Sequence, residues 1–263
     1  MKATINGREL AWEETGSGRT ILFLHGFPFN RQLWYNQLQA VPPGWRGVAM
    51  DLRGFGESAP SDDPQYTMDM HADDAAALLT HLRVRRAVIC GLSMGGYVAF
   101  AMHRRYPSMV GGLILADTRA TADTEQEKQN RLQLVQRVRA EGGSVVVDSM
   151  MQKLFAPATP YTKPKVAEFV RGMMSATHPE SMARALLGMA VRPDSEPGLR
   201  NINVPTLVIV GAEDQITPRG QAQLMARAIP GSQFEVIPEA GHVSNLEAPE
   251  IFNEGMRRLL ASF

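Results

Sequence analysis

The chain has 263 residues, a length that favours one large domain or one domain with an insertion. Its 27 Lys and Arg residues balance its 27 Asp and Glu residues, so composition gives no reason to expect a nucleic-acid partner or a polybasic membrane anchor. A single cysteine, Cys90, excludes an internal disulfide and a cysteine-based zinc site. No apolar run has signal-peptide or membrane-span length, so the default expectation is a cytoplasmic location.

The chain opens with a predicted hairpin, because Asn6-Gly7 favours a tight turn between residues 3–5 and 9–12. Short apolar runs then recur along the sequence, as expected for the strands of a parallel sheet that is covered on both faces. The predicted buried strands are Ile21–Leu24, Gly47–Asp51, Ala87–Cys90, Leu113–Ala116, Val204–Val210 and Phe234–Ile237.

Amphipathic stretches separate these apolar runs and predict helices between the strands. Strand–helix alternation of this kind indicates an α/β fold with a doubly wound sheet. Thr217-Pro218 is a helix-start signal, with Thr217 as the expected N-cap. The predicted helices are Tyr66–His81, Met94–Tyr106, Pro218–Ala228 and Ala248–Leu260.

The alternation stops between residues 119 and 199, where helix-like segments follow one another without strands. Glycine pairs and prolines separate these segments. We therefore predict an α/β core made of residues 1–118 and 200–263, and an inserted helical cap at residues 119–199. The predicted cap helices are Thr124–Glu141, Ser144–Phe155, Lys163–Ala176 and Pro179–Val191.

A candidate nucleophile lies in Gly91-Leu92-Ser93-Met94-Gly95-Gly96, which contains the pattern Gly-x-Ser-x-Gly between a predicted strand and a predicted helix. A sharp strand-to-helix turn holds such a serine in a strained conformation, and glycines remove side chains that would clash. The helix N-terminus favours negative charge that develops beside the hydroxyl. The five-residue pattern also occurs by chance in glycine-serine turns, but its context favours Ser93 as a nucleophile.

A serine nucleophile needs a base, and His242 is the best placed of the six histidines. It follows the last predicted strand, and the carboxyl ends of parallel strands are where such folds place active groups. The other histidines have structural interpretations. His25 ends a buried strand, His178 precedes a proline in a turn, and solvated helix positions are expected for His71, His81 and His103.

An acid must orient the base and stabilise its charged form. Asp214 follows the preceding predicted strand, in Gly211-Ala212-Glu213-Asp214, and is the first choice. Its alternative interpretation is a turn or cap residue before the next helix. Glu213 and Asp117 are rival acids, because Glu213 is adjacent and Asp117 follows the strand before.

An oxyanion hole completes this arrangement. The backbone N–H of Met94, next after the nucleophile, is one expected donor. The second donor is expected from the loop His25-Gly26-Phe27-Pro28, where Phe27 is the candidate because proline has no N–H. No phosphate-binding glycine loop and no metal-ligand spacing is present in the sequence, so neither a cofactor nor a metal is predicted.

Taken together, these residues resemble the α/β-hydrolase family, in particular small bacterial members that use no cofactor. The order Ser93, Asp214, His242 is the order of that family. The resemblance extends along essentially the whole chain and rests on five motifs: His25-Gly26-Phe27-Pro28, Asp51–Ser58, Gly91–Gly96, Gly211–Asp214 and Gly241-His242.

The resemblance implies an eight-stranded, mostly parallel sheet with a cap inserted after the sixth strand. It also implies a hydrolase of carboxylic esters or lactones that forms an acyl-enzyme, similar to carboxylesterases and 3-oxoadipate enol-lactonase-like proteins. C–C bond hydrolysis and haloperoxidase-like perhydrolysis remain alternatives. A different class of function is a ligand sensor, which would bind a small molecule under the cap without repeated turnover.

The expected partner is a small-molecule ester or lactone, and neither nucleic acid nor membrane is expected. Substrate choice depends on the cap, where the sequence is least informative. An enol-lactone that carries carboxylates would need a cationic pocket residue. Three arginines are candidates, although each is also compatible with a solvated charge: Arg119, Arg171 and Arg184.

Overall fold

One eight-stranded sheet forms the centre of the structure, a computed structural model that describes all 263 residues. All six predicted strands and the N-terminal hairpin are present. The last but one strand begins two residues later than predicted, because Pro205 has no N–H to donate to the sheet. The strands are β1 (Lys2–Ile5), β2 (Arg8–Gly16), β3 (Arg19–Leu24), β4 (Trp45–Met50), β5 (Ala87–Leu92), β6 (Val110–Ala116), β7 (Thr206–Gly211) and β8 (Gln233–Ile237).

The strand order across the sheet is β1-β2-β4-β3-β5-β6-β7-β8. β1 pairs with β2, and β2 with β4, in antiparallel fashion, whereas every other neighbouring pair is parallel. The sheet is therefore mostly parallel, as the sequence predicts. The parallel strands end at one edge, and this edge carries the loops after β3, β5, β6, β7 and β8.

Both faces of the sheet are buried, so successive residues of a strand can all be apolar. Strand β3 illustrates this. Leu22 and Leu24 belong to the larger hydrophobic cluster on one face, and Ile21 and Phe23 to the cluster on the other. Helices α2, α3 and α9 cover the first face, and α1 and α11 the second. The α-helices of the core, including the short α10, are α1 (Tyr35–Gln39), α2 (Met68–His81), α3 (Met94–Arg105), α9 (Arg219–Ala228), α10 (Ser244–Glu247) and α11 (Pro249–Leu260).

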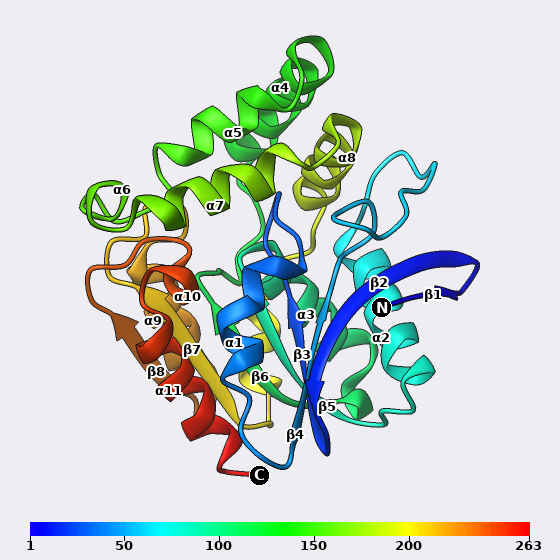
Figure 1. Cartoon of the computed structure of the whole chain (residues 1–263), viewed down its shortest axis with the longest axis vertical. Coiled ribbons are helices and arrows are strands. Elements are labelled where there is room, and N and C mark those ends of the chain that lie inside the picture. Colours follow the sequence, from blue (N-terminus) through cyan, green and yellow to red (C-terminus); the bar gives the residue numbers. More distant parts are fainter.

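Five helices lie between β6 and β7 and stand together above the carboxyl edge of the sheet (Figure 1). They fall within the residues predicted as a cap, and the longest begins with a capping box between Thr124 and Glu127. The pair α4 and α8 packs side by side. The cap helices are α4 (Glu125–Glu141), α5 (Ser144–Met151), α6 (Thr159–Thr162), α7 (Pro164–Ser175) and α8 (Pro179–Ala190).

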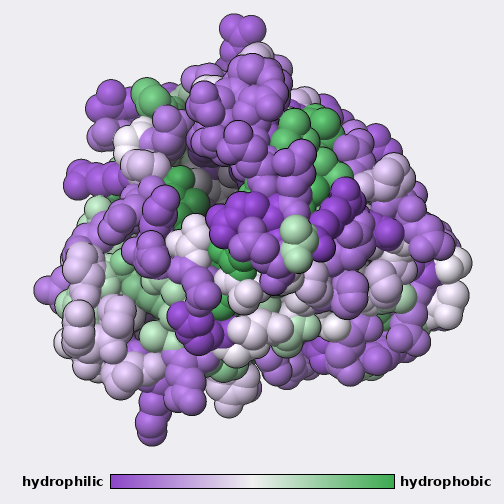
Figure 2. Space-filling view, turned by 90° about the horizontal axis from the view of Figure 1, so that it is seen from above, coloured by the Kyte–Doolittle hydropathy of each residue, from purple (hydrophilic) through white to green (hydrophobic).

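The short helices α1, α6 and α10 were not predicted, because four or five residues are too few to show a helical period. Short 3₁₀ helices occur at Arg31–Trp34, Pro107–Met109 and Glu196–Asn201. No helix combines the length and the hydropathy needed to cross a lipid bilayer. Seen from the cap side, the surface is mainly hydrophilic, and hydrophobic residues show inside a hollow of this face (Figure 2).

Candidate active site

Ser93 lies between the end of β5 and the start of α3, in a backbone conformation that few residues adopt. Its φ is 55° and its ψ −116°, and a positive φ in a residue with a Cβ is strained. A Cβ at Gly91 would lie 2.1 Å from the carbonyl oxygen of Gly95, and one at Gly95 would lie 2.0 Å from that of Leu24. Only glycine fits at these two positions, as the motif predicts.

The end of β6 holds this turn in place. The backbone N–H of Ser93 donates to the Ala116 carbonyl at 3.0 Å, and the Thr118 hydroxyl donates to the Ser93 carbonyl at 2.8 Å. The Ser93 side chain is half-buried at the N-terminus of α3. A hydroxyl in this position is presented at the carboxyl edge of the sheet, beside the positive end of a helix dipole.

His242 and Asp214 form a buried pair at the same edge. The imidazole Nδ1 donates to Asp214 Oδ2 at 2.9 Å, and the Thr217 hydroxyl donates to the same oxygen at 2.7 Å. The other carboxylate oxygen accepts the backbone N–H groups of Ile216 at 2.8 Å and Thr217 at 2.9 Å. The fully buried His242 Nε2 has no hydrogen-bond partner, so this nitrogen is free to exchange a proton.

The electrostatics of the pair favour an ion pair once His242 is protonated. Burial disfavours a charged Asp214, but the neighbouring imidazole and the hydrogen bonds outweigh it and lower the pKa of the carboxyl. Burial likewise opposes a charged His242, and the carboxylates of Asp214, Asp117 and Glu247 outweigh it and raise the pKa of the imidazole. The arrangement therefore stabilises an imidazolium in the dry interior.

The loop after β3 lies directly against the serine. A Cβ on Gly26 would come within 3.1 Å of both the Ser93 Cβ and the Leu92 carbonyl oxygen. The backbone N–H of Phe27 donates to no protein group. Met94 is the first residue of α3, where an N–H has no acceptor within the helix. The loop that carries Phe27 therefore lies beside Ser93, and Met94 follows Ser93 directly at the start of α3.

Neither rival acid forms a hydrogen bond with His242. The Glu213 side chain is exposed. Asp117 is fully buried, but its oxygens are occupied by the Gly211 N–H at 2.8 Å and the Ser244 hydroxyl at 2.6 Å. Burial, together with the charge of Asp214, raises the pKa of Asp117 well above its ordinary value. Asp117 therefore lies close to the pair as a second carboxyl group that is harder to ionise.

The expectation that His71 is solvated is wrong. The side chain is fully buried under Phe55 and Tyr66, neither ring nitrogen has a partner, and burial lowers the pKa to about 3. His25 directly follows the last residue of β3, and its two ring nitrogens form hydrogen bonds with the backbone of Gly26 and Leu52. Neither histidine is available to Ser93 as a base.

Two residues of the site were missed by sequence reasoning. Thr217 was expected to cap the next helix, but α9 begins at Arg219 without a side-chain cap, and the Thr217 hydroxyl binds Asp214 instead. Glu247 is a buried carboxylate that accepts the Gly241 N–H beside His242. Thr217 lies three residues after Asp214, where its hydroxyl could bind either the carboxylate or the next helix, and the burial of Glu247 depends on how the loops pack.

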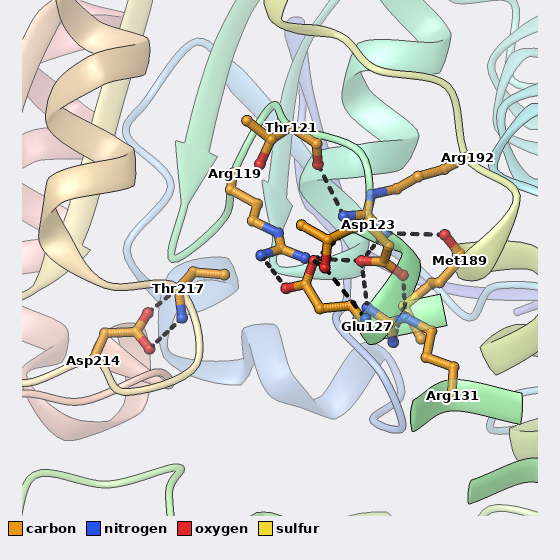
Figure 3. A network of polar contacts seen from close by, with 10 residues as sticks. Arg119, Thr121, Asp123, Glu127, Arg131, Met189, Arg192, Asp214 and Thr217 are labelled. Atoms are coloured by element: carbon orange, nitrogen blue, oxygen red, sulfur yellow. Dashed lines mark hydrogen bonds and ion pairs between the residues drawn. The ribbon is translucent and has the colours of Figure 1, made fainter. Parts of the chain in front are cut away.

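The three arginines proposed as substrate-binding cations are all engaged by carboxylates. Arg119 binds Asp123 and Glu127 in a polar network at the base of the cap, in which Arg131 and Arg192 also bind Asp123 (Figure 3). Arg171 pairs with Asp148 and Arg184 with Glu180. No three His, Cys, Asp or Glu side chains are grouped so that they could hold a metal ion.

The model of the alpha/beta hydrolase fold family matches residues 19–249, so the chain belongs to this family and is a hydrolase. It is similar to a thermophilic esterase from Thermogutta terrifontis, solved with malate bound, at 43% identity with a TM-score of 0.96, covering 100% of this chain and 98% of that one.

Lactone hydrolases are also among the relatives. The chain is 29% identical to 3-oxoadipate enol-lactonase 2 of Acinetobacter baylyi, over 100% of this chain and 98% of the relative. The structure of the enol-lactonase from Burkholderia xenovorans LB400 matches with a TM-score of 0.92 and 26% identity, covering 99% of this chain and 100% of that one.

Proposed function

We propose that the protein hydrolyses carboxylic esters or lactones through a triad of Ser93, His242 and Asp214. Ser93 is the nucleophile, His242 the general base and Asp214 the acid that orients it. The backbone N–H groups of Phe27 and Met94 form the oxyanion hole. The substrate is a small molecule, and the chemistry needs no cofactor beyond these groups.

One observation carries the proposal. A buried His242 is held through Nδ1 by Asp214, while its Nε2 lacks any protein partner. A base must be fixed in one tautomer and keep the opposite nitrogen open toward its nucleophile. Ser93, held in a strained conformation at the end of β5 on the same carboxyl edge of the sheet, is the side chain that this nitrogen would serve.

The reaction follows from these roles. Ser93 Oγ attacks the carbonyl carbon as its proton passes to His242 Nε2, and the resulting oxyanion accepts hydrogen bonds from the two backbone N–H groups. The tetrahedral intermediate collapses, and the imidazolium returns its proton to the leaving alkoxide. Water, activated by the same imidazole, then hydrolyses the acyl-enzyme and restores Ser93.

The relatives support the substrate class. Their names include an esterase and 3-oxoadipate enol-lactonases, and ester and lactone hydrolysis both break an acyl C–O bond. A lactone differs only in that the leaving alkoxide stays attached to the acyl group. A substrate carboxylate is not favoured by the arginines that we considered, because each already binds a carboxylate of the protein.

The test is a hydrolysis screen with p-nitrophenyl esters of graded acyl length and with simple lactones. We expect repeated turnover by the wild type, none by Ser93→Ala, and no effect of a metal chelator. Product that stops at one equivalent per chain would instead indicate a ligand sensor. No hydrolysis of any substrate in the screen would overturn the proposal.

A further inference from the structure

Glu247, at the end of α10, is a fully buried carboxylate that only accepts hydrogen bonds. One oxygen accepts the backbone N–H of Gly241 at 2.8 Å. The other accepts the N–H of Ala156 at 2.9 Å and the hydroxyl of Thr159 at 2.6 Å. Three convergent donors suit an ionised carboxylate, because each oxygen offers acceptor sites and no donor.

These contacts join two parts of the fold that are distant in the sequence. Gly241 precedes His242, whereas Ala156 lies in the cap segment between α5 and α6 and Thr159 is the first residue of α6. The same two segments also meet directly, since the His242 N–H donates to the Leu154 carbonyl at 2.7 Å. A Cβ on Gly241 would lie 2.6 to 2.7 Å from backbone atoms of residues 154–156. The backbone of cap residues 154–156 therefore packs directly against the loop that contains Gly241 and His242.

Three acidic side chains from different elements surround His242. Asp214 follows β7, Asp117 follows β6 and Glu247 ends α10, and all three carboxylates raise the pKa of the imidazole against burial. On the cap side, the ammonium of Lys163 donates to the backbone carbonyl of Glu247. Burial raises the pKa of Glu247, and its hydrogen bonds and Lys163 act in the opposite direction.

We propose that Glu247 is a positioning residue that fixes the His242 loop by tying it to the cap segment at residues 154–159. His242 therefore keeps its catalytic position only while cap residues 154–159 stay packed against its loop. Glu247 acts through the backbone of Gly241 and does not touch substrate. The inference rests on the role proposed above for His242.

Glu247→Gln tests this role with almost no change of shape. The new NH₂ group cannot accept a hydrogen bond, so either the Gly241 N–H or the two cap donors lose their acceptor. We expect kcat for a short-chain ester to fall about 10- to 100-fold, with KM within about threefold, because a small displacement of a catalytic group costs rate more than binding. Active-site titration restricts the comparison to folded enzyme.

A second readout separates positioning from simple stability. Loss of the Glu247 charge should lower the pKa of His242, so the rising limb of kcat/KM should move to lower pH. The same change should appear in an NMR titration of the His242 ring, which does not depend on turnover. Glu250→Gln, an exposed change three residues away, is the matched control and should leave both measurements unchanged.

Thr159→Val removes only one cap-side donor and keeps the charge. We expect a smaller loss of kcat and an unshifted His242 titration. Wild-type kcat and an unshifted pH profile in Glu247→Gln would overturn the inference. If that variant does not fold, wild-type kcat in Thr159→Val would overturn it. If the wild type hydrolyses no ester or lactone, the proposed function fails, and the NMR titration still tests the placement of His242 by Glu247.

Discussion

Replacing Asp214 by asparagine should disable His242 by reversing the direction of one hydrogen bond. Two backbone N–H groups, of Ile216 and Thr217, donate to Asp214 Oδ1. In Asp214→Asn the amide oxygen must stay there, because an NH₂ group cannot accept these bonds. The NH₂ group then occupies the Oδ2 position and donates to His242 Nδ1. The imidazole must carry its proton on Nε2, where it cannot accept one from Ser93.

The expected size of the loss of kcat comes from a triad with the same arrangement. In the chymotrypsin-type triad the corresponding change lowers kcat about 10⁴-fold, which is about 5 kcal/mol of transition-state stabilisation. We expect a similar loss here. Asp117 cannot replace Asp214 without giving up its bonds to the Gly211 N–H and the Ser244 hydroxyl.

The assay compares kcat of the wild type, Asp214→Asn, Asp117→Asn and the double variant on one activated ester. Thermal unfolding of each variant monitors the fold. Because burial favours the neutral form of Asp117, its asparagine variant should keep kcat within about tenfold of the wild type. A large loss of kcat in Asp117→Asn with little loss in Asp214→Asn would show that the acid is Asp117, at the end of β6, and not Asp214.

Three further predictions follow from the same site. Ser93→Ala should lower kcat by at least about 10⁴-fold at an unchanged unfolding temperature, and activity within tenfold of the wild type would contradict the nucleophile assignment. Plots of kcat/KM should rise with pH, because His242 must be neutral to act as a base. The midpoint should lie above the ordinary histidine value of 6.5, and a flat profile from pH 5 to 8 with chemistry limiting would be inconsistent with this. Gly95→Ala would place a Cβ 2.0 Å from the Leu24 carbonyl oxygen and should lower the free energy of unfolding by about 3 kcal/mol or more, measured by chemical denaturation.

The sequence predicts those parts of the fold that local chemistry decides. The β5–α3 turn is one, because the glycines that flank Ser93 are the only residues that fit its backbone. The apolar strands are another, since a sheet covered on both faces needs side chains that can be buried on either side. The predicted cap helix Thr124–Glu141 begins within one residue of the observed helix α4.

Contacts that depend on tertiary packing could not be predicted from the sequence. Glu247 meets Ala156 and Thr159 across 91 and 88 residues, and nothing near it in the chain marks it as different from a solvated glutamate. Thr217 was missed for a local reason, because a hydroxyl beside a helix start can cap the helix or bind a neighbouring carboxylate. His71 was misjudged because its burial depends on which face of α2 packs against Phe55.

In the proposed reaction, Ser93 forms a covalent intermediate with the acyl group of the substrate. Mass spectrometry of the protein after reaction with a phosphonate ester, followed by mapping of the labelled peptide, tests it most directly. We expect one adduct per chain, on Ser93, that is absent from Ser93→Ala and retained in Asp117→Asn. Continued ester hydrolysis after exposure, without an adduct or with the adduct on another residue, would contradict it.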